Sequence, residues 1–197
     1  MITERFLFCS FLCIFIKFSV IKIFLVLCCF LYVQDEPVMS WNDSHKLSWE
    51  DFKGKPNYQK SAVAITASGI SFGFSTKETD SKVVSFATEV FCHFYPEKSW
   101  YKPNRADNHV LGHEQLHFDI TELHVRKFRY RISQLKVSNS IKTQLRNLNK
   151  SINKELAIMQ NKYDAESDYS RHFENQAKWK TYIAIELEKF SKYKSTK

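Results

Sequence analysis

NHVLGHEQLHFDITEL, residues 108–123, is the stretch that decides how this chain is organised. It contains no proline, and Asp107 or Asn108 can cap its start, so we predict a helix from about residue 108 to 136. Residues four apart on a helix are turned by about 40° and separated by about 6 Å, so His113 and His117 face the same side. This spacing is typical of a Zn²⁺ site in which Glu114 acts as general base. The alternative is two surface histidines that happen to lie four residues apart.

Strand-like patterns precede this helix. Residues 61–75 are rich in small and β-branched side chains, and residues 84–94 alternate apolar and polar positions. A polar segment at 76–82 separates them, so we predict an antiparallel hairpin. A loop with two prolines, residues 95–107, then leads into the helix.

Two further helices are predicted downstream. Apolar residues recur there in alternating steps of four and three, which indicates a buried helical stripe: Ile141, Leu145, Leu148, Ile152, Leu156, Met159 and Tyr163. A third helix is expected from about 171 to 192. The predicted fold class is therefore α+β: a small antiparallel β-sheet followed by three long helices, with the HExxH motif on the first long helix.

The first 33 residues differ in composition from the rest of the chain. Residues 6–33 are almost wholly apolar, and two lysines precede an uninterrupted apolar run at 23–33 that is too short to span a bilayer. This layout favours a secretory signal peptide cleaved near Val33-Gln34. An uncleaved N-terminal membrane anchor, with membrane association through residues 6–33, is the second interpretation. Lipidation at Cys28 or Cys29 is the third. Each predicts export to the periplasm or the extracellular space.

The 197 residues suffice for one domain with a core. We predict a polar linker at 34–46, a single domain at 47–192 and a basic tail at 193–197. Four of the five cysteines lie in the N-terminal segment, so Cys92 has no disulfide partner in the domain and is predicted to be a buried strand residue. We assign the net charge of +8 to solvated helical faces. Nucleic acid is not expected as a partner, because the sequence contains no base-reading motif and the protein is predicted to be exported.

A catalytic zinc site needs a third protein ligand and one open position. His124 lies on nearly the same helical face as His117, but about 10 Å further along the axis, which is too far for a shared metal. The third ligand must therefore come from another part of the fold. Glu166 is our prediction, with Asp164 and His172 as alternatives. The same acidic segment would also suit a capped junction between two helices.

Several separate blocks of the sequence occur in a fixed order: LSWEDFKG at 47–54, Ser99-Trp100, HEQLHFD at 113–119, YDAES at 163–167, and Gln176 with Trp179. Together they resemble the bacterial domain-of-unknown-function family 922, over about residues 47–190. The resemblance implies export and a zincin-like fold with predicted zinc-dependent protease activity. In that family a histidine often follows the fourth block by two residues. Tyr169 occupies this position here, so the resemblance does not extend to it.

The leading hypothesis for function is an exported zinc metallopeptidase that hydrolyses an amide bond of a peptide, a protein or the cell-wall polymer. Its predicted site consists of His113, His117 and Glu166 as metal ligands, Glu114 as general base, and Tyr163 or Tyr169 as the donor to the oxyanion. The alternative is a non-catalytic, envelope-associated module in which the zinc site is structural or vestigial.

Overall fold

A computed structural model describes residues 36–195, and residues 37–195 belong to one compact unit. The predicted signal peptide or anchor at 1–33 lies outside the described residues, as do the last two residues of the predicted tail. Within 36–195, no helix has both the length and the hydropathy that crossing a membrane would require.

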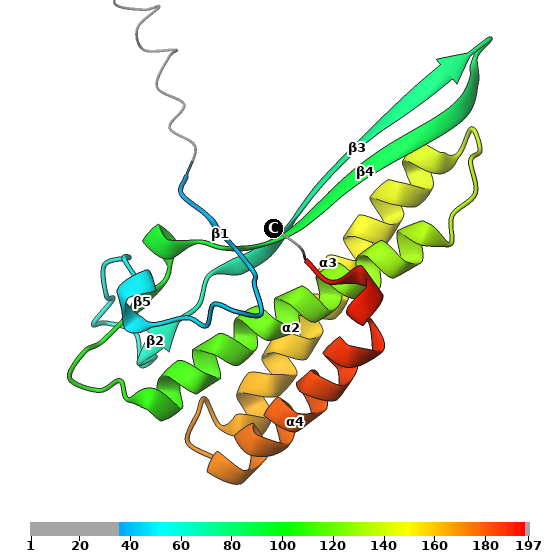
Figure 1. Ribbon diagram of the computed structural model, residues 1–197. Coiled ribbons are helices and arrows are strands. Elements are labelled where there is room, and N and C mark those ends of the chain that lie inside the picture. The colour runs from blue at the N-terminus through cyan, green and yellow to red at the C-terminus, as the bar shows by residue number, and fades with distance from the viewer. Residues whose placement is uncertain (1–35, 196–197) are drawn as a thin grey trace, which may run out of the picture. The chain divides into compact units, whose positions relative to one another are not determined.

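The architecture is α+β, as predicted: a small antiparallel sheet precedes three helices (Figure 1). The strands are β1 (Met39–Ser40), β2 (Ala64–Ile65), β3 (Ser68–Thr79), β4 (Lys82–Phe94) and β5 (Trp100–Tyr101). The helices are α2 (Asn108–Ser133), α3 (Ile141–Ser167) and α4 (Phe173–Lys189). Short 3₁₀ turns occupy η1 (Trp49–Asp51), η2 (Pro96–Lys98) and η3 (Ser191–Tyr193).

The predicted hairpin is present, but both of its strands extend further toward the turn than the sequence pattern indicated. β3 and β4 pair antiparallel through most of the segment predicted as a turn, and β1 adds to the far side of β4. Only Asp80 and Ser81 form the connection, with φ of 50° and 60°. Positive φ at both central residues is the requirement of the two-residue turn that matches strand twist. The polar composition of residues 76–82 therefore did not prevent most of them from forming strand.

The start of the predicted first strand forms a separate element. Residues 64–65 leave the hairpin and pair with residues 100–101 as a two-stranded sheet, β2–β5. Residues 100–101 are therefore strand and not part of the predicted loop at 95–107. The bend before Ser68 is fixed by hydrogen bonds: the Ala67 N–H donates to Ser99 Oγ (2.9 Å), and the Tyr95 N–H donates to the Ala67 carbonyl (2.9 Å).

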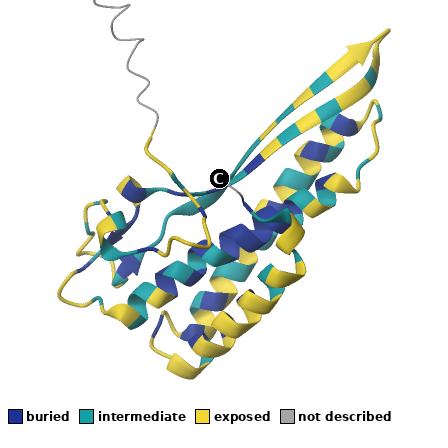
Figure 2. Ribbon diagram, in the orientation of Figure 1, coloured by how far each residue is buried: buried dark blue, intermediate teal, exposed yellow. Residues whose placement is uncertain are grey.

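Helix α2 lies between the sheet and the other two helices, and most of its middle is buried (Figure 2). Toward the sheet, Phe118 packs on Phe94 and Phe128 packs on Phe72, with ring centroids 5.7 and 4.8 Å apart. The opposite side of α2 packs into a second cluster with α3 and α4: Leu116, Ile120, Leu123, Leu156, Tyr163, Trp179 and Ile183. The predicted stripe on α3 is confirmed as core, since five of its seven residues are buried and the other two are partly buried. Cys92 is also confirmed as a buried free thiol.

Both ends of the described chain are packed against α2. Trp41, in the predicted linker, is 2% exposed, and its Nε1 donates to Asp119 Oδ1 at 2.7 Å. Ser195, in the predicted basic tail, is 5% exposed and donates from its N–H and its hydroxyl to the two oxygens of Glu122 at 2.9 and 2.7 Å. Composition identified these segments as polar, but a few of their residues complete the core.

The Glu122 carboxylate is fully buried and also accepts a hydrogen bond from Arg126 Nε at 2.8 Å. We expect Glu122→Gln to lower the free energy of unfolding by about 3–5 kcal/mol, because the buried Arg126 guanidinium loses its counter-charge. The matched control is Glu78→Gln in the exposed Glu78–Lys142 pair, which should cost less than about 1 kcal/mol. Urea denaturation of the two purified variants measures the difference. Equal midpoints would contradict the assigned role of Glu122.

Candidate metal centre

The HExxH motif lies in the first turns of α2, where Asp107 caps the helix as predicted. Its Oδ1 accepts a hydrogen bond from the Val110 N–H at 2.8 Å. The last turns of α3 run antiparallel beside this part of α2 and bring residues 160–164 opposite the two histidines. His113 and His117 project from one side of α2, as their spacing predicted.

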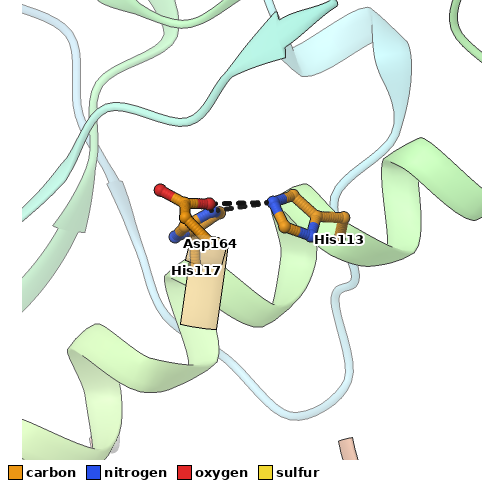
Figure 3. Close-up of side chains that lie close together, drawn as sticks. All are labelled: His113, His117 and Asp164. Atoms are coloured by element: carbon orange, nitrogen blue, oxygen red, sulfur yellow. Dashed lines mark hydrogen bonds and ion pairs between the residues drawn. The ribbon is translucent and has the colours of Figure 1, made fainter. Parts of the chain in front are cut away.

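Three ligand-type atoms from these two helices converge. His113 Nε2 lies 3.1 Å from His117 Nε2, and Asp164 Oδ1 lies 3.1 Å from the first and 2.9 Å from the second. Figure 3 shows both imidazoles and the carboxylate turned toward one another. Among the described residues, these three form the one group of histidine, cysteine and acidic side chains close enough to hold a metal ion together.

The donor set and its spacing fit a zinc ion. Zn²⁺ binds imidazole nitrogen and carboxylate oxygen at about 2 Å in tetrahedral geometry, which places neighbouring ligand atoms about 3.3 Å apart. The three observed separations of 2.9 to 3.1 Å are close to that value. Three protein ligands with the fourth position free is the pattern of a catalytic site rather than a structural one.

Gln160, one helical turn before Asp164, fixes the orientation of His117. Its amide NH₂ donates to the His117 carbonyl at 2.9 Å and to Thr121 Oγ1 at 3.3 Å, so its Oε1 must be the atom that accepts from His117 Nδ1. With Nδ1 hydrogen-bonded to Gln160, Nε2 is the nitrogen that faces Asp164 and His113: it donates to Asp164 when the ring is protonated and presents its lone pair when the ring is neutral. Such partners of ligating histidines orient the ring and raise its basicity.

The charges of the cluster favour a cation at this position. Burial disfavours the ionised form of Asp164, but hydrogen bonds with His113 and His117 outweigh burial and hold the pKa of Asp164 well below its usual range. Burial lowers the pKa of His117, whereas Asp164 and Glu114 raise it, and the net pKa lies above the ordinary value. Positive charge is therefore stabilised among these side chains.

Tyr163 packs beneath both histidines. Its ring stacks on His113 at 4.5 Å and meets the edge of His117 at 5.0 Å, so it holds both imidazoles in place. The side chain is buried, and its hydroxyl has no hydrogen-bond partner among the described residues. Burial and the charges of Glu114 and Asp164 raise the pKa of Tyr163 well above its usual value, so the phenol keeps its proton.

Glu114 is the neighbour of His113 in the chain and, like the two histidines and Asp164, lines a cleft on the protein surface. It is 5% exposed, and its Oε2 has no hydrogen-bond partner among the described residues. Its main-chain carbonyl accepts from the Thr66 hydroxyl at 3.2 Å, which ties α2 to the segment that follows β2. A buried carboxylate oxygen without a partner is costly unless a ligand or water satisfies it. Glu114 is therefore placed to act on whatever enters the cleft.

A cleft of about 840 Å³ gives access to these groups. One wall is residues 61–66, and the other is formed by the start of α2 and by residues 169–171. Residues 169–171 form the rim of the cleft, where Tyr169 is 65% exposed. Its φ is positive at 51°, and the φ angles of Asp168 (50°) and Ser170 (71°) are positive as well. His109 holds the rim, because its Nε2 donates to the Ser170 carbonyl at 2.8 Å and its ring stacks on Phe173.

Glu166, the predicted third ligand, is not in the cluster, and the alternative Asp164 is. Glu166 Oε2 instead accepts from Trp179 Nε1 at 2.9 Å, on the side of α3 that faces α4. The physical reason is that α3 continues to Ser167, so residues 164 and 166 are turned about 200° apart and cannot face the same helix. Residues 163–167 are therefore the last turn of α3, and not the predicted junction between two helices.

The other candidates are also placed. His172 is an exposed residue at the start of α4, where its Nδ1 accepts weakly from the Asn175 N–H at 3.4 Å, and it does not reach the cluster. His124 is directed elsewhere, as its distance along α2 predicted. Gln160 and Thr66 were not among the predicted site residues. Gln160 could have been found from the antiparallel pairing, since a helix that sets residue 164 opposite 113 sets residue 160 opposite 117.

Asp164→Asn should weaken zinc binding by more than ~100-fold, because even loss of an outer hydrogen-bond partner costs 10–100-fold. Glu166→Gln is the matched control, with the same chemical change two residues away on α3, and should bind zinc as the parent does. Competition with a chromophoric chelator on purified full-length protein measures both affinities. The assignment fails if Glu166→Gln loses zinc and Asp164→Asn keeps it.

Comparison with known proteins gives a family but no characterised relative. No curated protein and no solved structure matches the chain. One family profile, described as "Bacterial protein of unknown function (DUF922)", matches residues 53–174. This range covers most of the chain and includes the two histidines, Glu114, Gln160 and Asp164. The chain therefore belongs to the bacterial protein family of unknown function DUF922.

Proposed function

We propose that this protein is an exported zinc-dependent metallopeptidase. The observation that carries the proposal is the convergence of His113 Nε2, His117 Nε2 and Asp164 Oδ1 beside the unpartnered carboxylate oxygen of Glu114, in an open cleft. A structural zinc site is normally closed by four protein ligands. Three ligands, a candidate base and an access route support hydrolysis instead.

A zinc ion held by His113, His117 and Asp164 would supply Lewis acidity and lower the pKa of a bound water toward about 7. Glu114 is the chain's own base in this scheme. Its partnerless Oε2 would accept a proton in the cleft and return it to the leaving amine. Gln160 and Tyr163 keep the two imidazoles in orientation during this exchange.

The wall at residues 61–66 supports an extended peptide as substrate. The Lys102 N–H donates to the Val63 carbonyl at 2.9 Å, so the carbonyl of Val63 points across the ladder toward β5. Pairs alternate along an antiparallel ladder, which makes Ala64–Tyr101 a non-hydrogen-bonded pair and turns the main-chain groups of Ala64 to the free edge of β2. A peptide main chain can pair with such an edge.

Two tyrosines remain the candidates for stabilising an oxyanion. Tyr169 stands on the rim of the cleft with an exposed side chain, and its positive φ reflects a backbone held in an unfavourable conformation. Tyr163 keeps a protonated hydroxyl, for which the described residues offer no partner. We assign Tyr169 this role, because it lines the cleft, whereas Tyr163 is buried under the imidazoles.

Glu114→Gln should lower hydrolysis of fluorescein-labelled casein by about 10²–10⁴-fold while zinc remains bound, because the amide cannot accept the proton. Zinc content and casein hydrolysis are measured on the same preparation of full-length protein, with Glu166→Gln as control. Hydrolysis that survives in Glu114→Gln refutes the assigned base. A parent protein that binds one zinc and cleaves neither casein nor cell-wall peptides supports the non-catalytic alternative.

Export is the second part of the proposal and rests on residues 1–33. We expect the protein outside the cytoplasm, with a mature N-terminus near Gln34. N-terminal sequencing after cell fractionation tests this expectation. An intact Met1 in the membrane fraction would support the anchor, and an intact Met1 in the cytoplasm would refute export.

A further inference from the structure

A second hollow lies on the other side of α3 from the metal centre. This groove has a volume of about 770 Å³ and runs between α3 and α4, with α2 as its floor. The volume is in the range of small-molecule sites in proteins, about 300–1,000 Å³. The metallopeptidase scheme uses none of the groove's residues.

The floor of the groove carries a buried polar group with an unused lone pair. His124 is 1% exposed, and its Nδ1 donates to the Ile120 carbonyl at 2.8 Å. Nε2 is therefore the acceptor nitrogen of the ring, and no described residue donates to it. Burial lowers the pKa of His124, so the ring is neutral and the lone pair is available. A ligand in the groove satisfies this nitrogen only if it brings an N–H or O–H group.

The walls above His124 are apolar and aromatic. Met159 comes from α3, and Trp179 and Tyr182 come from α4, with the two rings edge to face at 5.7 Å. Tyr182 is 43% exposed and Ile158 at the mouth is 57% exposed. Thioether and indole surfaces favour a flat ring between them. The body of the ligand is therefore expected to be aromatic.

The charges around the groove favour an anion. Glu155 is occupied by Arg131 through two 2.7 Å hydrogen bonds, and Glu166 is occupied by Trp179 and Lys162. Lys127 pairs with Glu186 at 3.7 Å. Lys178 contacts only the Asn175 side-chain oxygen, at 3.5 Å, and pairs with no carboxylate among the described residues. Lys178 is thus the cation that remains available to a ligand.

We propose that the groove binds a small aromatic acid that carries a hydrogen-bond donor on its ring system. The donor contacts His124 Nε2, the ring lies between Met159 and Trp179, and the carboxylate pairs with Lys178. This would be a second ligand site, independent of the metal centre, on the opposite side of α3.

Isothermal titration calorimetry of the full-length protein tests the site with three probes. Indole-3-acetate has the ring, the N–H and the acid, and should bind with one-to-one stoichiometry. Naphthalene-1-acetate lacks the N–H and should bind about tenfold more weakly, because His124 Nε2 then stays unpaired. Tryptamine replaces the acid with an amine and should not bind. Equal affinity for the three probes, or no binding of indole-3-acetate, overturns the proposal.

Variants distinguish this site from others on the protein. Lys178→Glu should reduce indole-3-acetate affinity at least about fivefold, as expected for a reversed surface charge. Lys180→Glu is the matched control: it is exposed on α4, turned about 200° from Lys178, and should bind as the parent does. Binding must also persist in Asp164→Asn. Loss of indole-3-acetate binding in Asp164→Asn would mean that the acid binds at the metal centre. An equal loss of affinity in Lys180→Glu and Lys178→Glu would mean that only the net charge of the protein matters. Either result overturns the proposal.

Discussion

Burial of α2 on all sides is the constraint on which the rest of the structure depends. The sheet covers one face and α3 and α4 cover the other, so residues 120–126 are buried without interruption. A helix enclosed in this way must satisfy every polar side chain within the protein, because an unpaired buried group costs about 1–3 kcal/mol. Glu122 accepts from Arg126 and from Ser195, and Arg126 also donates to the Leu187 carbonyl. His124 satisfies its Nδ1 with the Ile120 carbonyl and directs Nε2 to the groove between α3 and α4.

The first turns of α2 depart from this rule. Four buried side-chain atoms lack a hydrogen-bond partner among the described residues: His113 Nδ1, Glu114 Oε2, Tyr163 Oη and Gln176 Oε1. All four belong to this end of α2 or to side chains packed against it, since Gln176 donates to the His109 carbonyl at 3.0 Å. Native proteins concentrate unsatisfied polar groups at functional sites. Among the described residues, the buried charged pair in the middle of α2 is satisfied, whereas the polar atoms at its first turns are left for a ligand or water.

Antiparallel packing of α2 and α3 brings two pairs of residues together, each pair spaced four positions apart on its own helix. His113 and His117 face Asp164 and Gln160 in reversed order, so each histidine has a partner one turn along the opposite helix. The sheet takes part from the other side, because Ser68 on β3 hydrogen-bonds Thr121 at 2.7 Å and Thr121 donates to the His117 carbonyl at 3.1 Å. The three-stranded sheet therefore supports the helix that carries the two histidines, whereas the wall of the cleft at residues 61–66 includes β2 of the separate two-stranded sheet.

The sequence by itself determined the elements whose signals are local. Helical periodicity predicted α3 and its buried stripe, alternation predicted the β3–β4 hairpin, and the spacing of His113 and His117 predicted that both face one side. These features depend on residues within one or two turns of each other, so the pattern contains the information. The turn predicted at 76–82 contains the observed turn at Asp80–Ser81, but the strand pairing of residues 76–79 and the strand at 100–101 were missed, because pairing across the sheet overrode local composition.

Only the tertiary structure decided which acidic side chain completes the site. Asp164 and Glu166 are chemically similar and two residues apart, and either fits a sequence pattern. Because α3 stays helical to Ser167, a turn of about 200° directs Asp164 to α2 and Glu166 to Trp179 on α4. The choice depends on where a helix ends and which face its neighbour covers. Both are set by packing between residues about 50 positions apart in the chain, which no local pattern records.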